Sequence, residues 1–299
     1  MNHTAKGFVC GILAAMAYGT NPLFSLKLLQ VGLDVETILF YRFSIAALVL
    51  GCFIFFSGKS LAVPRKAIFP LFLGGIVFAL SSQTLYQSFL YMDAGIACSI
   101  LFVYPILVAV IMAVFFHERA SWLTYACIAV ALSGIGLLYQ GDGHVTLSTT
   151  GLLLVILSSL CYAVYIVGVD HSVLRSVPSG RMTFWVLVSG TFLFFVCTGF
   201  GTQLKPLQLS AECLTNVLGV AMVPTVIPIL FINVAIKSIG PTFSAIIGAL
   251  EPVTALMIGV CVFDEQLTVR IVTGAVLIFA AVITIVSKPL LGKYFAKNK

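Results

Sequence analysis

The sequence predicts an all-α integral membrane protein, with ten transmembrane helices arranged as two inverted five-helix repeats around a central cavity. Composition is the first observation: of 299 residues, 61% are hydrophobic and 9% are charged. A soluble domain carries about 25% charged residues. The mean hydropathy of +1.14 agrees with a chain that lies mostly in lipid. The other two observations are the number of apolar runs and an internal repetition of short motifs.

Ten apolar runs have the length of a membrane-spanning helix, and short polar segments separate them. Lysine and arginine gather in cytoplasmic loops of membrane proteins. With the N-terminus inside, the cytoplasmic segments hold twelve basic residues and the opposite side holds four. Both termini are therefore expected in the cytoplasm. The expected spans are residues 7–27, 37–56, 68–91, 95–116, 121–139, 150–169, 182–201, 213–235, 240–262 and 269–287.

Short motifs recur in the two halves in the same order. Tyr104-Pro105 in the fourth span matches Glu251-Pro252 in the ninth, 147 positions later. The same separation relates residues 116–118 to residues 263–265. Because five is an odd number of spans, the second half must cross the membrane in the opposite sense. Inverted repeats of this kind place a central site between the halves.

These motifs, with Tyr41-Arg42-Phe43 at the start of the second span, resemble the drug/metabolite transporter superfamily, specifically its EamA-type permeases. The resemblance covers nearly the whole chain. It implies two EamA-type repeats, expected here at residues 1–143 and 144–299. It also implies a carrier of the inner membrane, commonly an exporter of amino acids or other small metabolites. One departure is that the first half has Tyr104 where the second has Glu251, so any coupling through an acid would be one-sided.

Glu251 is the most informative single residue. It follows Gly240 by eleven positions, which places it ~16 Å along a helix and near the middle of the membrane. A carboxylate there costs several kcal/mol unless it is protonated, paired or hydrated. One interpretation is a proton-coupling residue on the transport pathway. The other is a protonated structural glutamate that caps a backbone carbonyl freed by Pro252.

Polar and aromatic side chains inside the spans are expected to line the cavity. Gln83 and Gln87 are four residues apart and share a helix face, where their amides could bind a substrate or could join neighbouring helices. The expected substrate-binding residues are Tyr18, Asn21, Gln83, Tyr86, Gln87, Tyr104, Tyr162, Trp185 and Asn233.

Four prolines inside the spans are candidate hinges: Pro22, Pro224, Pro228 and Pro252. Proline lacks an N–H and breaks a helical hydrogen bond, so each marks either a fixed bend or a hinge. Pro224 and Pro228, four residues apart, are expected to break the eighth span midway.

Two further sets of charged residues lie near predicted helix ends. Arg42 is expected to anchor the second span, pairing with Asp34, Glu36 or Asp93, although attraction of an anionic group is the alternative. Glu118 and Glu265 follow the fourth and ninth spans and are expected to cap the next helix or to contact loop backbone.

The sequence argues against several other classes of protein. The four histidines lie at span ends or in loops, and the cysteines are scattered singly, so neither an intramembrane enzyme nor a metal or cofactor site is expected. The basic residues lie in short loops rather than on one face, which argues against nucleic acid binding. The expected partners are a small-molecule substrate and the lipid bilayer, with protons and a second copy of the chain left open. A facilitator or channel, and a flippase for lipid-linked substrates, remain alternatives.

Overall fold

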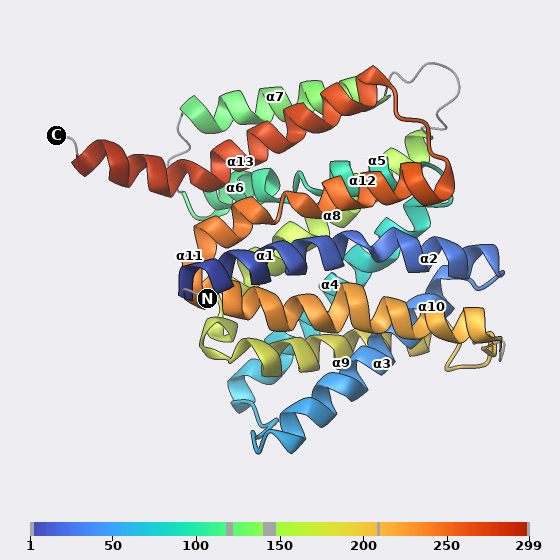
Figure 1. Ribbon diagram of the computed structural model, residues 1–299. Coiled ribbons are helices and arrows are strands. Elements are labelled where there is room, and N and C mark those ends of the chain that lie inside the picture. The colour runs from blue at the N-terminus through green and yellow to red at the C-terminus, as the bar shows by residue number, and fades with distance from the viewer. Residues whose placement is uncertain (1–2, 118–121, 140–147, 208–209, 298–299) are drawn as a thin grey trace.

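The computed structural model is a bundle of helices (Figure 1), and it describes residues 3–117, 122–139, 148–207 and 210–297. No β-strand occurs among these residues. The α-helices are α1 (His3–Gly19), α2 (Asn21–Gln30), α3 (Val35–Phe56), α4 (Arg65–Ser88), α5 (Ala94–Leu101), α6 (Tyr104–Phe115), α7 (Trp122–Tyr139), α8 (Thr149–Asp170), α9 (Ser179–Cys197), α10 (Ala211–Ala221), α11 (Ile227–Ile247), α12 (Leu250–Phe263) and α13 (Val269–Lys297). A short 3₁₀ turn, Val173–Ser176, follows α8, and a π-helical turn, Met222–Val226, joins α10 to α11.

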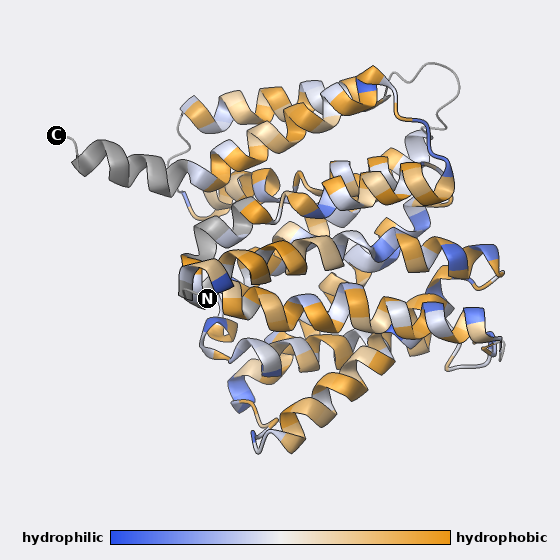
Figure 2. Ribbon diagram, viewed as in Figure 1, coloured by the Kyte–Doolittle hydropathy of each residue, from blue (hydrophilic) through white to orange (hydrophobic). Residues whose placement is uncertain are grey.

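Eight segments of the described chain are long and apolar enough to cross a membrane. Two further apolar helices, Trp122–Leu138 and Leu250–Phe263, are shorter, with 10–17 residues each. Figure 2 shows hydrophobic residues along the helices and hydrophilic residues gathered at their ends. The all-α membrane fold expected from the sequence is confirmed.

Three of the expected spans are broken helices, which the sequence did not predict for the fourth and ninth spans. The first span divides at Thr20 and the fourth at residues 102–103. The ninth divides at residues 248–249, between the end of α11 and the start of α12. Each break lies well inside its span, where hydrocarbon offers backbone groups no hydrogen-bond partner unless protein or water encloses them.

Each half-helix after a break has a polar residue followed by a proline in its first turn. Asn21-Pro22 opens α2, Tyr104-Pro105 opens α6, and Glu251-Pro252 lies in the first turn of α12. Proline suits this position because its fixed φ is helical and its missing N–H would have no helical acceptor there. The prolines therefore explain where the half-helices start, while their role as hinges stays a prediction.

The eighth span runs without a gap from α10 through the π-helical turn into α11, so the break expected at its two prolines is an irregular turn of a continuous helix. Pro224 lies within the π-helical turn, and Pro228 follows in the first turn of α11. The Thr225 hydroxyl donates to the carbonyl oxygen of Val220 at 3.0 Å and so satisfies a carbonyl beside the irregular turn. The structure thus has an irregular turn at the two prolines, whereas a hinge movement there stays a prediction.

Helix α11 contains the reversal between the eighth and ninth spans, which the sequence placed in a loop at residues 236–239. A Cβ on Gly11 would lie 3.5 Å from Ala235 and 3.2 Å from Ile247. Twelve residues of straight helix would separate those two positions by about 18 Å. Both can meet Gly11 only if the chain doubles back between them. The tip lies near Ser238 and Ile239, whose side chains face Gly7.

Equivalent backbone geometry supports the two-repeat architecture. His117 and Asp264, which occupy matching positions in the two motifs, both adopt the left-handed conformation, with φ of 53° and 55°. Few residues other than glycine adopt this conformation. The repeat boundary expected near residue 143 lies outside the described residues.

Hydrogen bonds between serines connect the two halves. The Ser81 hydroxyl on α4 donates to the Ser158 carbonyl at 2.9 Å, and the Ser158 hydroxyl on α8 donates to the Ser81 carbonyl at 2.7 Å. Both residues are buried. Small polar residues of this kind allow close approach of membrane helices and hold them together.

Helices α7 and α13 pair along one edge of the bundle (Figure 1). Glycines set their separation: a Cβ on Gly134 would lie 2.7 Å from the Gly274 carbonyl oxygen, and a Cβ on Gly274 would lie 2.8 Å from the Gly134 carbonyl oxygen. Real Cβ atoms do not approach backbone so closely, so these two positions require glycine.

We therefore expect Gly134→Ala to lower stability by about 1–3 kcal/mol, because the added methyl group forces the two helices apart. Gly136→Ala is the matched control on the same helix, since a Cβ there meets no atom within 4 Å. It should leave stability unchanged or raise it slightly. Thermal unfolding of the purified variants measures both, and equal behaviour of the two would contradict the proposed packing constraint.

Candidate functional site

The broken first and ninth spans meet near the middle of the molecule. Gly19 makes the contact possible, because a Cβ there would lie 2.5 Å from the carbonyl oxygen of Glu251. This close approach brings residues 18–22 against the first turn of α12. We use "central polar group" for the residues that gather at this contact: Tyr18, Asn21, Arg42, Tyr86, Tyr104, Tyr162, Tyr165, Thr225 and Glu251.

Arg42 joins helices from both halves at this point. Its Nε donates to the Thr225 hydroxyl at 3.0 Å. Its Nη1 donates to Asn21 Oδ1 at 3.2 Å and to the Tyr86 hydroxyl at 2.8 Å. The Tyr86 hydroxyl in turn donates to Asn21 Oδ1 at 2.6 Å. One guanidinium thus holds three elements, α2, α4 and the π-helical turn, around α3.

The expectation that Arg42 anchors a helix end beside an acidic partner is wrong. Arg42 lies about two turns into α3 and is only 8% exposed. It forms none of the ion pairs found among the described residues. The long side chain turns inward because Asn21, Tyr86 and Thr225 supply oxygen acceptors there, whereas Asp34 and Glu36 are engaged elsewhere.

Glu251 is half-buried at the start of α12 and faces the same region. It interacts electrostatically with Arg42, although the pair does not approach within the 4.0 Å of an ion pair. Among the described residues no hydrogen bond to its side chain is found. A structural glutamate that caps the carbonyl freed by Pro252 would show such a bond, so the geometry favours a carboxyl group that faces the site.

Tyrosines form the other side of the central polar group. The rings of Tyr104 on α6 and Tyr162 on α8 meet edge to face, with centroids 4.6 Å apart. Tyr165, one turn further along α8, stacks with Tyr162 at 6.4 Å. Tyr18, Tyr104 and Tyr162 are all close enough to Glu251 to interact with it electrostatically. The structure therefore brings together Tyr18, Asn21, Tyr86, Tyr104, Tyr162 and Glu251 of the predicted residues.

Gln83 and Gln87 share a helix face as expected, but their amides already have a protein acceptor. Both Nε2 atoms donate to Glu36 Oε1, at 3.2 and 3.3 Å. Glu36 lies in the first turn of α3. In this arrangement the two glutamines join α4 to α3, and a contact with substrate stays a prediction.

The structure places Trp185 away from the central polar group. Its indole Nε1 donates to the Leu61 carbonyl at 3.0 Å, and its ring packs against a separate small core of Ala67, Leu71, Leu174 and Val177. Asn233 lies on α11, and its side chain is outside the described part of the structure. Sequence position within a span could not distinguish Trp185 from the residues that do meet.

Glu265 caps a helix of the other half rather than the helix that follows it. Its carboxylate oxygens accept from the backbone N–H groups of Ala94 and Gly95, at 2.9 and 3.2 Å, at the start of α5. Gly95 and Gly259 leave the space that its side chain fills. Glu118, the matching residue of the first half, lies outside the described residues.

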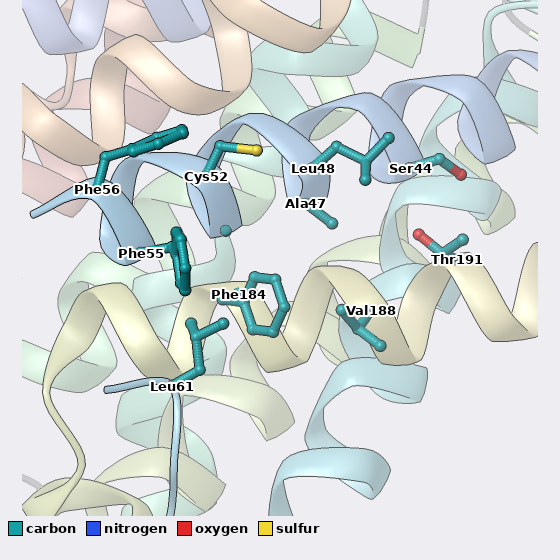
Figure 3. Close-up of a pocket in the computed structure, with 11 residues that line it drawn as sticks. Ser44, Ala47, Leu48, Cys52, Phe55, Phe56, Leu61, Phe184, Val188 and Thr191 are labelled. Carbon is teal, nitrogen blue, oxygen red and sulfur yellow. The ribbon is translucent and has the colours of Figure 1, made fainter. Parts of the chain in front are cut away.

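An apolar groove on the outer surface is separate from the central polar group. Figure 3 shows it between α3 and α9, with Phe55, Leu61 and Phe184 facing one another across it. Its volume is about 610 Å³, and none of its lining residues belongs to the central polar group. Among the described residues no cluster of three or more histidine, cysteine or acidic side chains could hold a metal ion.

Comparison with known proteins identifies the family. The model of the EamA-like transporter family matches residues 5–140 and again residues 149–287. The chain belongs to this family. An uncharacterized transporter of Archaeoglobus fulgidus is 24% identical over 280 residues, which cover 91% of this chain and 93% of that protein.

A second transporter and one solved structure are also similar to this chain. The uncharacterized transporter YdfC of Bacillus subtilis is 25% identical over 187 residues, covering 62% of this chain and 60% of that protein. One solved crystal structure matches with a TM-score of 0.68 over 97% of this chain and 99% of that one. At 16% sequence identity, that match shows a shared fold.

In this EamA-like transporter, the central polar group combines one cation, one acid and several hydroxyl groups. Such a set can bind a polar solute through charge and hydrogen bonds at the contact of broken helices, as in other transporters with discontinuous spans. Sequence reasoning missed Arg42, Tyr165 and Thr225 as members. Thr225 had a signal, because it lies between the two prolines of the eighth span.

The Glu265 cap predicts a pH dependence of stability. Burial, with the nearby Asp93 carboxylate, raises the pKa of Glu265 from the usual 4.5 to about 7, although the two backbone N–H groups favour the ionised form. The folded protein therefore holds this proton more tightly than the unfolded chain does. The resulting contribution to stability is full below about pH 4.5 and is lost as the pH rises through about 7.

Glu265→Gln removes this titration. The melting temperature of the parent protein, minus that of Glu265→Gln, should therefore be smaller at pH 8 than at pH 5. Thermal unfolding at both values tests this, with Glu212→Gln as a control at an exposed glutamate on α10. A difference that grows with pH would refute the assignment.

Proposed function

We propose that the protein is a secondary carrier of the inner membrane that exports amino acids by alternating access, coupled to protons through Glu251. Both termini would lie in the cytoplasm, which the twelve basic residues on that side support. Membership of the EamA-like transporter family supports transport as such. The identity of the substrate, the direction of transport and the coupling to protons are proposed here.

The observation that carries the proposal is the meeting of two broken helices around opposite charges. Asn21 opens α2 and Glu251 lies in the first turn of α12. Arg42 donates hydrogen bonds to Asn21 and Thr225 and interacts with Glu251 electrostatically. Half-helices that end at a shared site can present charges and backbone dipoles to a solute. Their irregular joints can also change angle as one half rocks against the other.

Glu251 is the acid that a proton-coupled exchange would use. A carboxyl group this deep is costly when charged and unpaired, so it favours either a bound proton or a bound cation. If the ammonium group of a substrate and a proton compete for Glu251, then each crossing carries one or the other. Inward proton movement would thereby drive export of the substrate.

The first test is counterflow in liposomes. Liposomes that contain the purified protein and are loaded with one unlabelled amino acid should accumulate the same labelled amino acid from outside, because a carrier exchanges bound solute in both directions. The rate of uptake should saturate with the external concentration. A panel that includes aromatic, aliphatic and polar amino acids identifies the substrate. Flux without saturation or counterflow would instead indicate a facilitator or channel.

Glu251→Gln tests the coupling. The neutral amide cannot bind and release a proton, so we expect an imposed pH gradient to drive no accumulation. Counterflow without a gradient should remain, at reduced rate, because exchange requires no net proton movement. Glu212→Gln makes the same change at the exposed glutamate of α10 and should behave as the parent protein. Unchanged pH-driven uptake by Glu251→Gln would exclude this residue as the proton carrier.

A further inference from the structure

We propose that Arg42 binds the carboxylate of the substrate, so that the central polar group selects solutes that carry a carboxylate. In a zwitterionic substrate, Arg42 would contact the carboxylate and Glu251 would contact the ammonium group. This inference rests on the proposed carrier function and names the chemistry that the site recognises. It gives Arg42 a binding role in addition to its role in joining helices.

Arg42 carries a positive charge that is buried and has no anionic group of the described residues in contact. The residue is 8% exposed within the described bundle, yet the three acceptors of its hydrogen bonds are neutral oxygens of Asn21, Tyr86 and Thr225. A buried cation without an anionic partner is costly in a membrane, and such residues commonly mark substrate pathways. Glu251 lies within electrostatic range, but no direct ion pair forms. Within the described bundle the guanidinium therefore has no anionic group in direct contact, and the carboxylate of a substrate could supply one.

The second argument is the hydrogen-bonding capacity that remains. Arginine has five N–H donors in a planar fork. Nε and Nη1 are engaged with described residues, whereas none of the hydrogen bonds found in the described structure uses Nη2. Nη2 is therefore the donor left for a ligand. Because three helical elements fix the other two nitrogens, its direction is set before a ligand arrives, which lowers the cost of binding.

The third argument is the distribution of charge around Arg42. The N-termini of α2 and α12 both lie at the site, and helix N-termini favour negative groups. Glu251 supplies the complementary negative charge, more than 4.0 Å from the guanidinium. An α-amino acid carries its ammonium and carboxylate groups on one carbon, so it can contact both residues without closing the gap between them. A neutral solute could accept a hydrogen bond from Nη2 but would leave the charge of Arg42 unbalanced, and a purely cationic solute would do neither.

The rival explanation is that Arg42 only ties α2, α3, α4 and the π-helical turn together. The two explanations differ in what they predict for the ligand. A structural arginine makes no distinction between a carboxylate and an amide on the solute. A carboxylate-binding arginine makes that distinction, and the distinction disappears when the arginine is replaced.

The experiment uses matched sets of solutes with the unaltered protein. Each set contains an amino acid, its carboxamide, its amine without the carboxylate, and its acid without the ammonium group. Competition against labelled amino acid in counterflow and stabilisation of the detergent-purified protein in thermal unfolding are both measured. Loss of a hydrogen bond to a charged group costs roughly tenfold or more in affinity, so the carboxamide and the amine should bind at least that much more weakly than the amino acid.

Variants then assign the effect to Arg42. Arg42→Gln should bind amino acid and carboxamide equally weakly, and Arg42→Lys should recover part of the preference because it keeps the charge. Arg65→Gln changes an exposed arginine at the start of α4 and should keep the full preference. Should Arg42→Gln fail to fold, the solute comparison on the unaltered protein and on Arg42→Lys still decides.

The outcomes separate this inference from the proposed function. Equal binding of amino acid and carboxamide by the unaltered protein overturns the inference while leaving amino acid transport intact, and so does a preference that survives in folded Arg42→Gln. A preference for carboxylates that are not amino acids supports carboxylate binding by Arg42 but overturns both amino acid export and the pairing of Glu251 with an ammonium group. A panel in which no carboxylate binds or exchanges overturns both.

Discussion

Backbone hydrogen bonding in the membrane is the constraint on which this structure depends. Hydrocarbon offers no partner to a free N–H or carbonyl group, so a helix can be interrupted only where protein or water encloses the interruption. Three spans are broken, at Thr20, at residues 102–103 and at residues 248–249. Their breaks lie inside the bundle and carry residues of the central polar group. The cost of breaking a helix in lipid thus explains why the polar residues gather in one place.

Charge balance is the second consequence of the same enclosure. Arg42 and Glu251 belong to different halves and are held by different elements, so their separation depends on how the halves sit against each other. The hydroxyl and amide groups around Arg42 hold its guanidinium in one orientation without neutralising it. A bound solute that supplies the missing charges would stabilise one arrangement of the halves over another, which is the physical requirement for a ligand to shift a conformational equilibrium.

Much of the fold follows from the sequence because the length of each apolar run and the repetition of short motifs can be read without knowing which residues meet in space. The spans and the two-repeat architecture were predictable in this way, and the two prolines of the eighth span marked its irregular turn. The breaks in the fourth and ninth spans were not, although in hindsight Tyr104-Pro105 and Glu251-Pro252 repeat the polar-proline pair of Asn21-Pro22.

The candidate site was predictable only in part. Nine of the predicted substrate-binding and coupling residues have side chains that the structure describes. Six of these nine do meet: Tyr18, Asn21, Tyr86, Tyr104, Tyr162 and Glu251. Gln83, Gln87 and Trp185 have protein partners instead. Which of several polar residues face each other depends on helix rotation, and the inward path of the long Arg42 side chain depends on acceptors that lie far away in sequence.

The Glu265 cap has a consequence for how the two halves relate as separate pieces of chain. The first N–H groups of α5 find their acceptor only in the second half, and the reciprocal bonds of Ser81 and Ser158 likewise need both halves. A first half produced alone would leave these groups without their partners. The duplicated architecture is therefore not two self-sufficient modules joined by a linker. Each half supplies hydrogen-bond partners to backbone groups of the other, so two fragments synthesised separately would associate in the membrane.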